Sequence, residues 1–157
     1  MKPSDVLRHA LLGALVLSTM LLPAVAGSEF HGARSGPAIE GYDPVAYQTN
    51  GAPLRGQANF AAEWGGATWW FESDANRQQF LAHPQRYAPQ YGGHCALAMA
   101  NGYFAAGDPQ RWKVVDGKLY LNNNLIVHKL WQRDTAQKIA DADNEWTGKR
   151  RELEAQP

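Results

Sequence analysis

Apolar residues along the chain switch between short runs typical of strands and a three-to-four-residue spacing typical of helices. The clearest helical pattern lies at 125–146, where one face carries Val127, Trp131, Thr135, Ile139, Ala142 and Trp146. Asp134 and Gln137 resemble a capping box, so we expect this helix to break near Arg133 and to restart. Residues 148–157 are mostly charged or polar and predict a solvated tail.

Two other stretches predict β-hairpins. The first surrounds a Gly-Gly step at 65–66, which is flanked by Trp64 and by the aromatic run 69–71. The second surrounds Asp116-Gly117, a strong signal for a two-residue turn.

A shorter helix is expected at 74–82, because Ser73 is a favoured N-cap and the His83-Pro84 step disfavours its continuation. No internal repeat and no βαβ spacing is visible in the sequence. The pattern therefore predicts a small single α+β domain, with two β-hairpins packed against helices and a long C-terminal helix.

The N-terminal 26 residues have the features of a secretory signal peptide. A positive start is followed by the apolar run 10–22 and by Ala24-Val25-Ala26, so cleavage is expected after Ala26. The expected mature protein is exported to the periplasm, and the apolar run is short for a membrane span. Residues 27–39 are rich in small residues and predict a flexible leader, with His31 solvated in it.

The charge balance argues against two classes of partner. Lys and Arg number 15 in the whole chain and Asp and Glu also 15, so the chain is neutral. Nucleic acids and anionic membrane surfaces attract proteins with a basic footprint, which this composition does not supply. We therefore expect no nucleic acid and no stable membrane insertion, and consider a metal ion, a small ligand or a partner protein.

The stretch 86–102 contains the most distinctive chemistry. Cys95 is the single cysteine, and His94 and Met99 lie close to it in sequence. On a helix, Cys95 and Met99 would share a face, whereas His94 would reach the same point only at the helix start. A lone thiol can be buried and inert, can bind a metal, or can pair with another chain.

Several motifs, taken in order, resemble the YHS-domain family in its exported bacterial form, over about residues 40–147. The matching residues are Gly41-Tyr42-Asp43-Pro44-Val45-Ala46-Tyr47, Phe71-Glu72-Ser73, Asn76-Arg77, Phe80, Pro84, Tyr87-Ala88-Pro89-Gln90-Tyr91-Gly92-Gly93, Cys95-Ala96, Asp108-Pro109, Trp112, Gly117-Lys118-Leu119-Tyr120-Leu121-Asn122, Trp131 and Trp146. This resemblance implies metal binding, with copper more expected than zinc. The chain departs from the pattern in having one cysteine, and in carrying His94 where Tyr is usual.

Two functions follow as hypotheses. In the first, Cys95, His94 and Met99 bind copper, because thiolate and thioether suit Cu(I), and His83 or His128 completes the site. In the second, the protein is a non-catalytic module for a small ligand or a partner, with Tyr91, Gly92 and Gly93 at the binding site and Cys95 buried and structural.

An enzyme is not expected, because adjacent residues on a helix point apart and His94 is poorly placed to activate Cys95. The surroundings of Cys95 distinguish the two hypotheses. Convergence of Cys95 Sγ, Met99 Sδ and a histidine nitrogen on one point open to solvent favours metal binding. Enclosure of Cys95 by Trp and Tyr rings, with no nitrogen nearby, favours the structural role.

Overall fold

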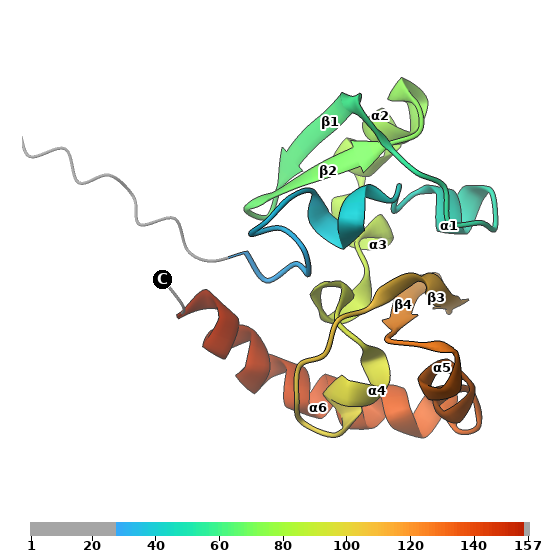
Figure 1. The fold of residues 1–157 in the computed structure, drawn as a ribbon, viewed down its shortest axis with the longest axis vertical. Coiled ribbons are helices and arrows are strands. Elements are labelled where there is room, and N and C mark those ends of the chain that lie inside the picture. Colours follow the sequence, from blue (N-terminus) through green and yellow to red (C-terminus); the bar gives the residue numbers. More distant parts are fainter. Residues whose placement is uncertain (1–27, 156–157) are drawn as a thin grey trace, which may run out of the picture.

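The computed structural model describes residues 28–155, so the predicted signal peptide lies outside the described residues. The elements in chain order are η1 (Ala38–Gly41), α1 (Ala46–Thr49), β1 (Gln57–Trp64), β2 (Ala67–Phe71), α2 (Asp74–Ala82), α3 (Pro84–Tyr87), η2 (Gln90–Gly93), α4 (Ala96–Ala100), β3 (Asp108–Val115), β4 (Lys118–Asn122), α5 (Leu125–Gln132) and α6 (Thr135–Glu154). Two antiparallel hairpins pack among helices (Figure 1), which confirms the α+β prediction and the long C-terminal helix. Within the described residues, no helix combines the length and the apolar character needed to span a membrane.

The order and spacing of the elements repeat. We name η1 to α3 the first unit and η2 to α6 the second unit; they form the upper and lower halves of Figure 1. Each unit consists of a 3-10 turn, a short helix, a hairpin and two helices. The strand β3 starts 51 residues after β1 (residue 108 against residue 57), and α5 starts 51 residues after α2 (residue 125 against residue 74). The structure therefore repeats the order of its elements, although no repeat is visible in the sequence.

The hairpins of the two units match in detail. Each has a two-residue turn with positive φ at both positions, and each has a register shift near its open end, at Gln57/Ala61 in one and Asp108/Trp112 in the other. Turns with two positive φ angles follow the natural twist of a hairpin. Both predicted hairpins are thus confirmed, with equivalent geometry.

Glycines are the residues that the two units visibly share. Gly41 and Gly93 close the equivalent 3-10 turns, with φ of 77° and 79°. Gly56 precedes β1 and Gly107 precedes β3. A Cβ atom at Gly56 would lie 2.4 Å from the Trp70 backbone, and one at Gly107 would lie 2.2 Å from the Gly93 oxygen. Only glycine fits such positions, whereas a core position accepts any side chain of suitable volume. The repeat is therefore preserved in backbone geometry and is hidden in the sequence.

The start of α2 follows the prediction, and α5 starts in the same way. Ser73 Oγ accepts a hydrogen bond from Asn76 N at 3.2 Å, and Asn124 Oδ1 accepts one from Val127 N at 3.0 Å. The C-terminal helix is interrupted at Arg133-Asp134, as expected. Residues 148–154, predicted as a solvated tail, instead continue α6 to Glu154, although most of their side chains are exposed.

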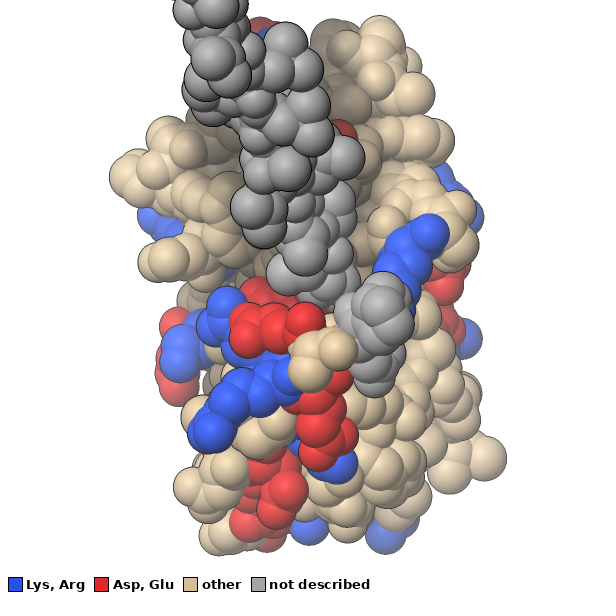
Figure 2. All heavy atoms as spheres, turned by 90° about the vertical axis from the view of Figure 1, so that its left-hand side faces the viewer, with Lys and Arg blue, Asp and Glu red and all other residues tan. Residues whose placement is uncertain are grey.

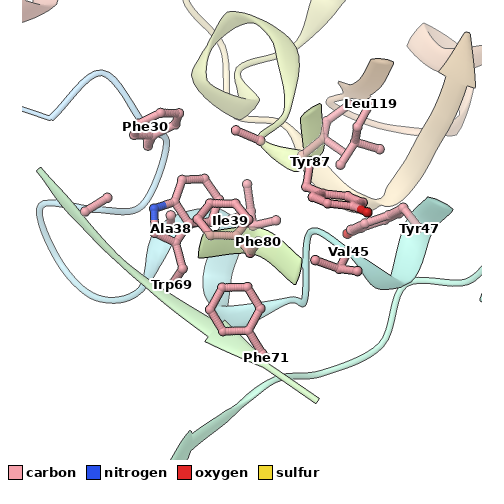
Figure 3. Close-up of a cluster of buried hydrophobic side chains, with 13 residues drawn as sticks. Phe30, Ala38, Ile39, Val45, Tyr47, Trp69, Phe71, Phe80, Tyr87 and Leu119 are labelled. Carbon is pink, nitrogen blue, oxygen red and sulfur yellow. The ribbon is translucent and has the colours of Figure 1, made fainter. Parts of the chain in front are cut away.

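The first core is built largely from aromatic side chains of the first unit (Figure 3). Its buried members include Ile39, Val45, Trp69, Phe71 and Phe80. The second core lies between α4, α5 and α6 and contains the buried side chains of Tyr91, Ala96, Met99, Tyr120, Trp131 and Ala142. Phe80 and Trp131 occupy equivalent positions in α2 and α5, and both are fully buried.

The described part of the predicted flexible leader is packed against the first core. Phe30 is 5% exposed, and its ring lies 4.8 Å from the Trp69 ring and 5.4 Å from the Trp64 ring, measured between centroids. His31 N donates a hydrogen bond to Gly92 O at 2.7 Å, so the segment also contacts η2 of the second unit. The small-residue composition predicts a flexible leader, but burial of the large aromatic side chain of Phe30 stabilises the docked segment.

A buried carboxylate joins the parts of the first unit. Asp43 is fully buried; its Oδ1 accepts hydrogen bonds from Val45 N at 2.8 Å and Ala46 N at 3.4 Å. Its Oδ2 accepts from Glu72 N at 2.9 Å and Asn76 Nδ2 at 2.7 Å. One side chain therefore fixes the start of α1, the end of the hairpin and the first turn of α2.

We predict that Asp43→Asn lowers the free energy of unfolding by about 2–4 kcal/mol, because the amide turns two N–H groups toward donors whichever way it is oriented. Asp74→Asn is the matched control: Asp74 is in the same region but exposed, and pairs with Arg77 at the surface. Its loss is expected to cost less than about 1 kcal/mol. Chemical denaturation measures both, and equal losses would contradict the role assigned to Asp43.

Candidate ligand-binding site

The backbone between η2 and α4 separates the predicted site residues. Tyr91 and Gly92 have φ of 55° and 61°, after which His94 and Cys95 are extended. His94 bridges to Ala106, and Cys95 bridges to Leu121. Successive side chains on extended backbone point to opposite sides, so His94 and Cys95 face different environments. The expectation that they meet at a helix start is not met.

Cys95 faces the interior. It is 1% exposed, and its thiol donates to Asn122 Oδ1 at 3.8 Å; the same oxygen accepts from Leu97 N at 3.3 Å. Asn122 Nδ2 lies 3.3 Å from His128 Nδ1, so His128 approaches the thiol only through the amide. Cys95 occupies in the second unit the position that Asp43 occupies in the first, between the turn, the hairpin end and the following helix.

Met99 is also enclosed. It is fully buried and belongs to the second core with Tyr91 and Trp131. The two sulfur atoms therefore offer no open coordination site, which favours the structural interpretation of Cys95. Within residues 28–155, no cluster of three or more His, Cys, Asp or Glu side chains could hold a metal ion. His83, on the first unit, is exposed at the end of α2.

His94 points to an open cavity of about 300 Å³. The cavity is lined by Ser28, Phe30, His31, Gly32, Arg34, Ser35, His94 and Leu153. The ring centroids of His31 and His94 are 5.6 Å apart, with 58° between the ring planes. On its other side, the His94 ring packs against Phe104, at 5.0 Å between centroids. Arg34 Nη2 donates to Leu153 O at 3.4 Å, which joins the turn 31–36 to the end of α6.

Burial lowers the pKa of both imidazoles in this cavity. Burial lowers the pKa of His94 to about 4, and His31 lowers it further, while the backbone of Ala105 and Glu29 acts in the opposite direction. Burial also lowers the pKa of His31, against the charge of Glu40. The His94 ring therefore already has hydrogen-bond partners in the backbone of Ala105 and Glu29.

The predicted ligand residues Tyr91 and Gly92 line a second, smaller cavity of about 140 Å³, on the other side of the segment 28–30. Tyr91 Oη donates to Asp143 Oδ1 at 2.8 Å, and burial and this carboxylate raise the pKa of Tyr91. Gly93 lines neither cavity. A Cβ atom at Gly92 would lie 2.1 Å from Glu29 O and one at Gly93 2.7 Å from an Ile39 methyl, so both glycines serve close packing.

Sequence reasoning missed His31 and Asn122. The composition predicts a flexible leader around His31, although Phe30 beside it is the one large apolar side chain between Ala26 and Ile39 and indicates docking. For Asn122, no sequence signal marks it as the partner of Cys95. Both residues act through contacts between segments distant in sequence.

The surface beside the cavity carries mixed charge. Figure 2 shows acidic and basic side chains interspersed over the lower half of that face. Pairs such as Lys149–Glu152 and Arg150–Glu154 account for part of this pattern. Arg150 Nε also lies 2.5 Å from Glu29 Oε2, which joins α6 to the segment that carries His31.

Comparison of the chain with protein-family models, with curated proteins and with solved structures gives no match. The resemblance to the YHS-domain family therefore stays a prediction made from sequence motifs.

We predict that wild type loses up to about 3 kcal/mol of folding stability, relative to His94→Phe, when the pH falls from 6.5 to 4. The unfolded chain binds a proton at His94 in this interval and the folded chain does not, so acid favours unfolding. Below pH 4 the difference should stop growing. Urea denaturation at several pH values measures it, and parallel pH profiles for the two proteins would contradict the neutral, buried state of His94.

Proposed function

We propose that this protein is an exported, non-catalytic ligand-binding domain of the YHS type. In this proposal the ligand binds in the 300 Å³ cavity beside His94, and Cys95 has a structural role. The observation that carries the proposal is the opposite placement of two neighbours: His94 lines an open cavity, whereas Cys95 is 1% exposed and hydrogen-bonded to Asn122.

The cavity has the features of a site for a small ligand. Its wall combines an apolar floor at Phe30 with hydroxyl, imidazole and guanidinium groups of Ser35, His31, His94 and Arg34. Small-ligand sites have this combination of apolar lining and a few placed polar groups. The cavity lies where the segment 28–36, η2 and the end of α6 meet, and ligand sites are common at such junctions.

The alternative copper site at Cys95, His94 and Met99 receives less support from the geometry. Cu(I) would have to enter between α4, β4 and α5 and displace the hydrogen bond from the thiol to Asn122. Catalysis by the thiol is disfavoured for the same reason, because a nucleophile needs access to its substrate.

We predict that Cys95 does not react with iodoacetamide in the native protein and reacts fully in denaturant, because the thiol is enclosed. Intact-mass measurement after timed labelling follows the reaction. An engineered surface thiol, Ser35→Cys in a Cys95→Ser background, is the control for reagent activity. Rapid labelling of native wild type would overturn the structural role of Cys95 and restore the copper hypothesis.

We further predict that native mass spectrometry of the protein purified from the exported fraction detects a bound small species. Ser35→Trp should remove it, because Ser35 is exposed on the cavity wall and an indole there would fill the space. Gln85→Trp, on an exposed residue of the second cavity, is the control and should keep it. A bound species that survives Ser35→Trp, or no bound species in wild type, would contradict the proposed site.

A further inference from the structure

We propose that the exposed face of α5 docks onto an anionic phospholipid surface. The face consists of Leu125, Ile126, Lys129, Leu130 and the C-cap residue Arg133. In this arrangement the leucine and isoleucine side chains enter the lipid interface, and the basic side chains contact lipid phosphates. The inference goes beyond the proposed ligand site and does not depend on what the cavity binds.

The face is apolar and strongly exposed. Ile126, Leu125 and Leu130 are 72%, 47% and 43% exposed, and they are three of the five exposed large apolar side chains among the described residues. Successive residues on a helix are rotated by about 100°, so all five residues of the face fall within an arc of about 140°. The opposite side of α5 carries Trp131, which is fully buried in the second core. Contiguous exposed apolar surface marks an interaction site.

The equivalent helix of the first unit shows that the fold does not require this apolar face. The positions 51 residues earlier, on α2, are also exposed, and they carry Asp74, Ala75, Gln78, Gln79 and Ala82. Each helix buries one large aromatic residue at the equivalent position, Phe80 in α2 and Trp131 in α5. The other side of each helix thus makes the core contact, and the large apolar residues on the exposed side of α5 have no counterpart on α2.

Basic side chains share the exposed face with the apolar ones. On the helical arc, Lys129 and Arg133 lie between Leu125 and Leu130, and α5 itself contains no Asp or Glu. Asp134, the acidic residue that follows, is the N-cap of α6. Long basic side chains place their apolar stems beside apolar neighbours and their charged ends in the polar layer. The face therefore combines the two features of a helix that binds at a membrane surface.

The neighbouring strand β3 adds positive charge. Burial lowers the pKa of His128 on α5, and the charges of Lys113 and Arg111 lower it further, so both cations act on this helix. Arg111 Nε lies 3.6 Å from Asp108 Oδ2, which offsets part of its charge, whereas Lys113 is exposed. The neutral composition, which argues against an anionic membrane partner, does not describe this local surface.

Two other partners fit this face less well. A second copy bound about a two-fold axis would bring Lys129 and Arg133 of both chains together, because such an interface pairs the same patch with itself. An acidic partner protein would need a groove shaped for Ile126, which projects with 72% of its surface exposed. A bilayer surface needs no shaped groove, and it supplies acyl chains and phosphates at adjoining depths.

Docking through α5 leaves the proposed ligand cavity open to solvent. In Figure 1, α5 lies at the right of the second unit, whereas the segment 28–36 and the C-terminal end of α6 lie at the left. These two left-hand segments supply most of the cavity wall. The protein can therefore bind a lipid surface and a cavity ligand at the same time.

The test is co-sedimentation of the untagged exported protein with vesicles made of equal parts of phosphatidylglycerol and phosphatidylcholine, and with vesicles of phosphatidylcholine alone. We expect binding to the first vesicles, at least about tenfold weaker binding to the second, and a decrease as salt is raised. Ile126→Ser and Leu130→Ser should each lower the affinity about tenfold, because each removes a buried apolar contact with lipid. Lys129→Gln should lower it about fivefold.

The matched controls change the first unit. Leu81→Ser removes a leucine of α2 that is 43% exposed, as Leu130 is, and Arg86→Gln removes one exposed positive charge from α3. Both controls should bind vesicles as wild type does. Ser35→Trp, which fills the proposed ligand cavity, should also leave vesicle binding unchanged. Circular dichroism confirms that every variant is folded.

Failure of wild type to sediment with the anionic vesicles would overturn the inference. Equal binding of wild type and Ile126→Ser, an equal loss in Leu81→Ser, or equal binding to neutral vesicles would also overturn it. If the vesicles are not bound and analytical ultracentrifugation shows a dimer that Ile126→Ser separates, the face is a contact between copies and the membrane assignment is wrong. Native mass spectrometry measures the cavity ligand separately, so failure of one proposal is distinguishable from failure of the other.

Discussion

The hydrogen bonds to the buried carboxylate of Asp43 are the constraint on which the first unit depends. Four donors from three elements converge on its two oxygens, so the turn, the hairpin and α2 cannot move independently. A buried polar group is tolerated only when it is hydrogen-bonded, and here donors from the backbone and from Asn76 bind both oxygens. The aromatic core packs against the turn, the hairpin and α2, whose relative positions these hydrogen bonds fix.

The second unit joins its turn to its hairpin end through a weaker contact, the long hydrogen bond from the Cys95 thiol to Asn122. Cys95 and Asn122 occupy the junction where Asp43 and Asn76 meet in the first unit, and they carry no charge into the interior. The Cys95 thiol is enclosed by the side chains around it and makes one long hydrogen bond, so solvent does not reach it. The repeat therefore explains why the single cysteine of the chain lies enclosed at this junction.

The open cavity beside His94 lies outside these two centres. The segment 28–36 crosses from the first core, where Phe30 is buried, to the second unit, where it meets Gly92 and the end of α6. The open cavity forms along this crossing. It brings together His31 and His94, which 62 intervening positions separate in the chain. Burial lowers the pKa of both imidazoles.

The sequence alone determined the elements whose signals are local. The Gly65-Gly66 and Asp116-Gly117 turns, the Ser73 cap, the His83-Pro84 stop and the capping box at Asp134 and Gln137 all act within a few residues. They predict both hairpins, α2, and the break between α5 and α6. The tertiary structure decided the rest. The two units are equivalent in the backbone conformation at their glycines and in having filled cores, but most of their core side chains differ. The docking of Phe30, the pairing of Cys95 with Asn122 and the approach of His31 to His94 each join segments distant in sequence, and spacing along a chain carries no information on such contacts.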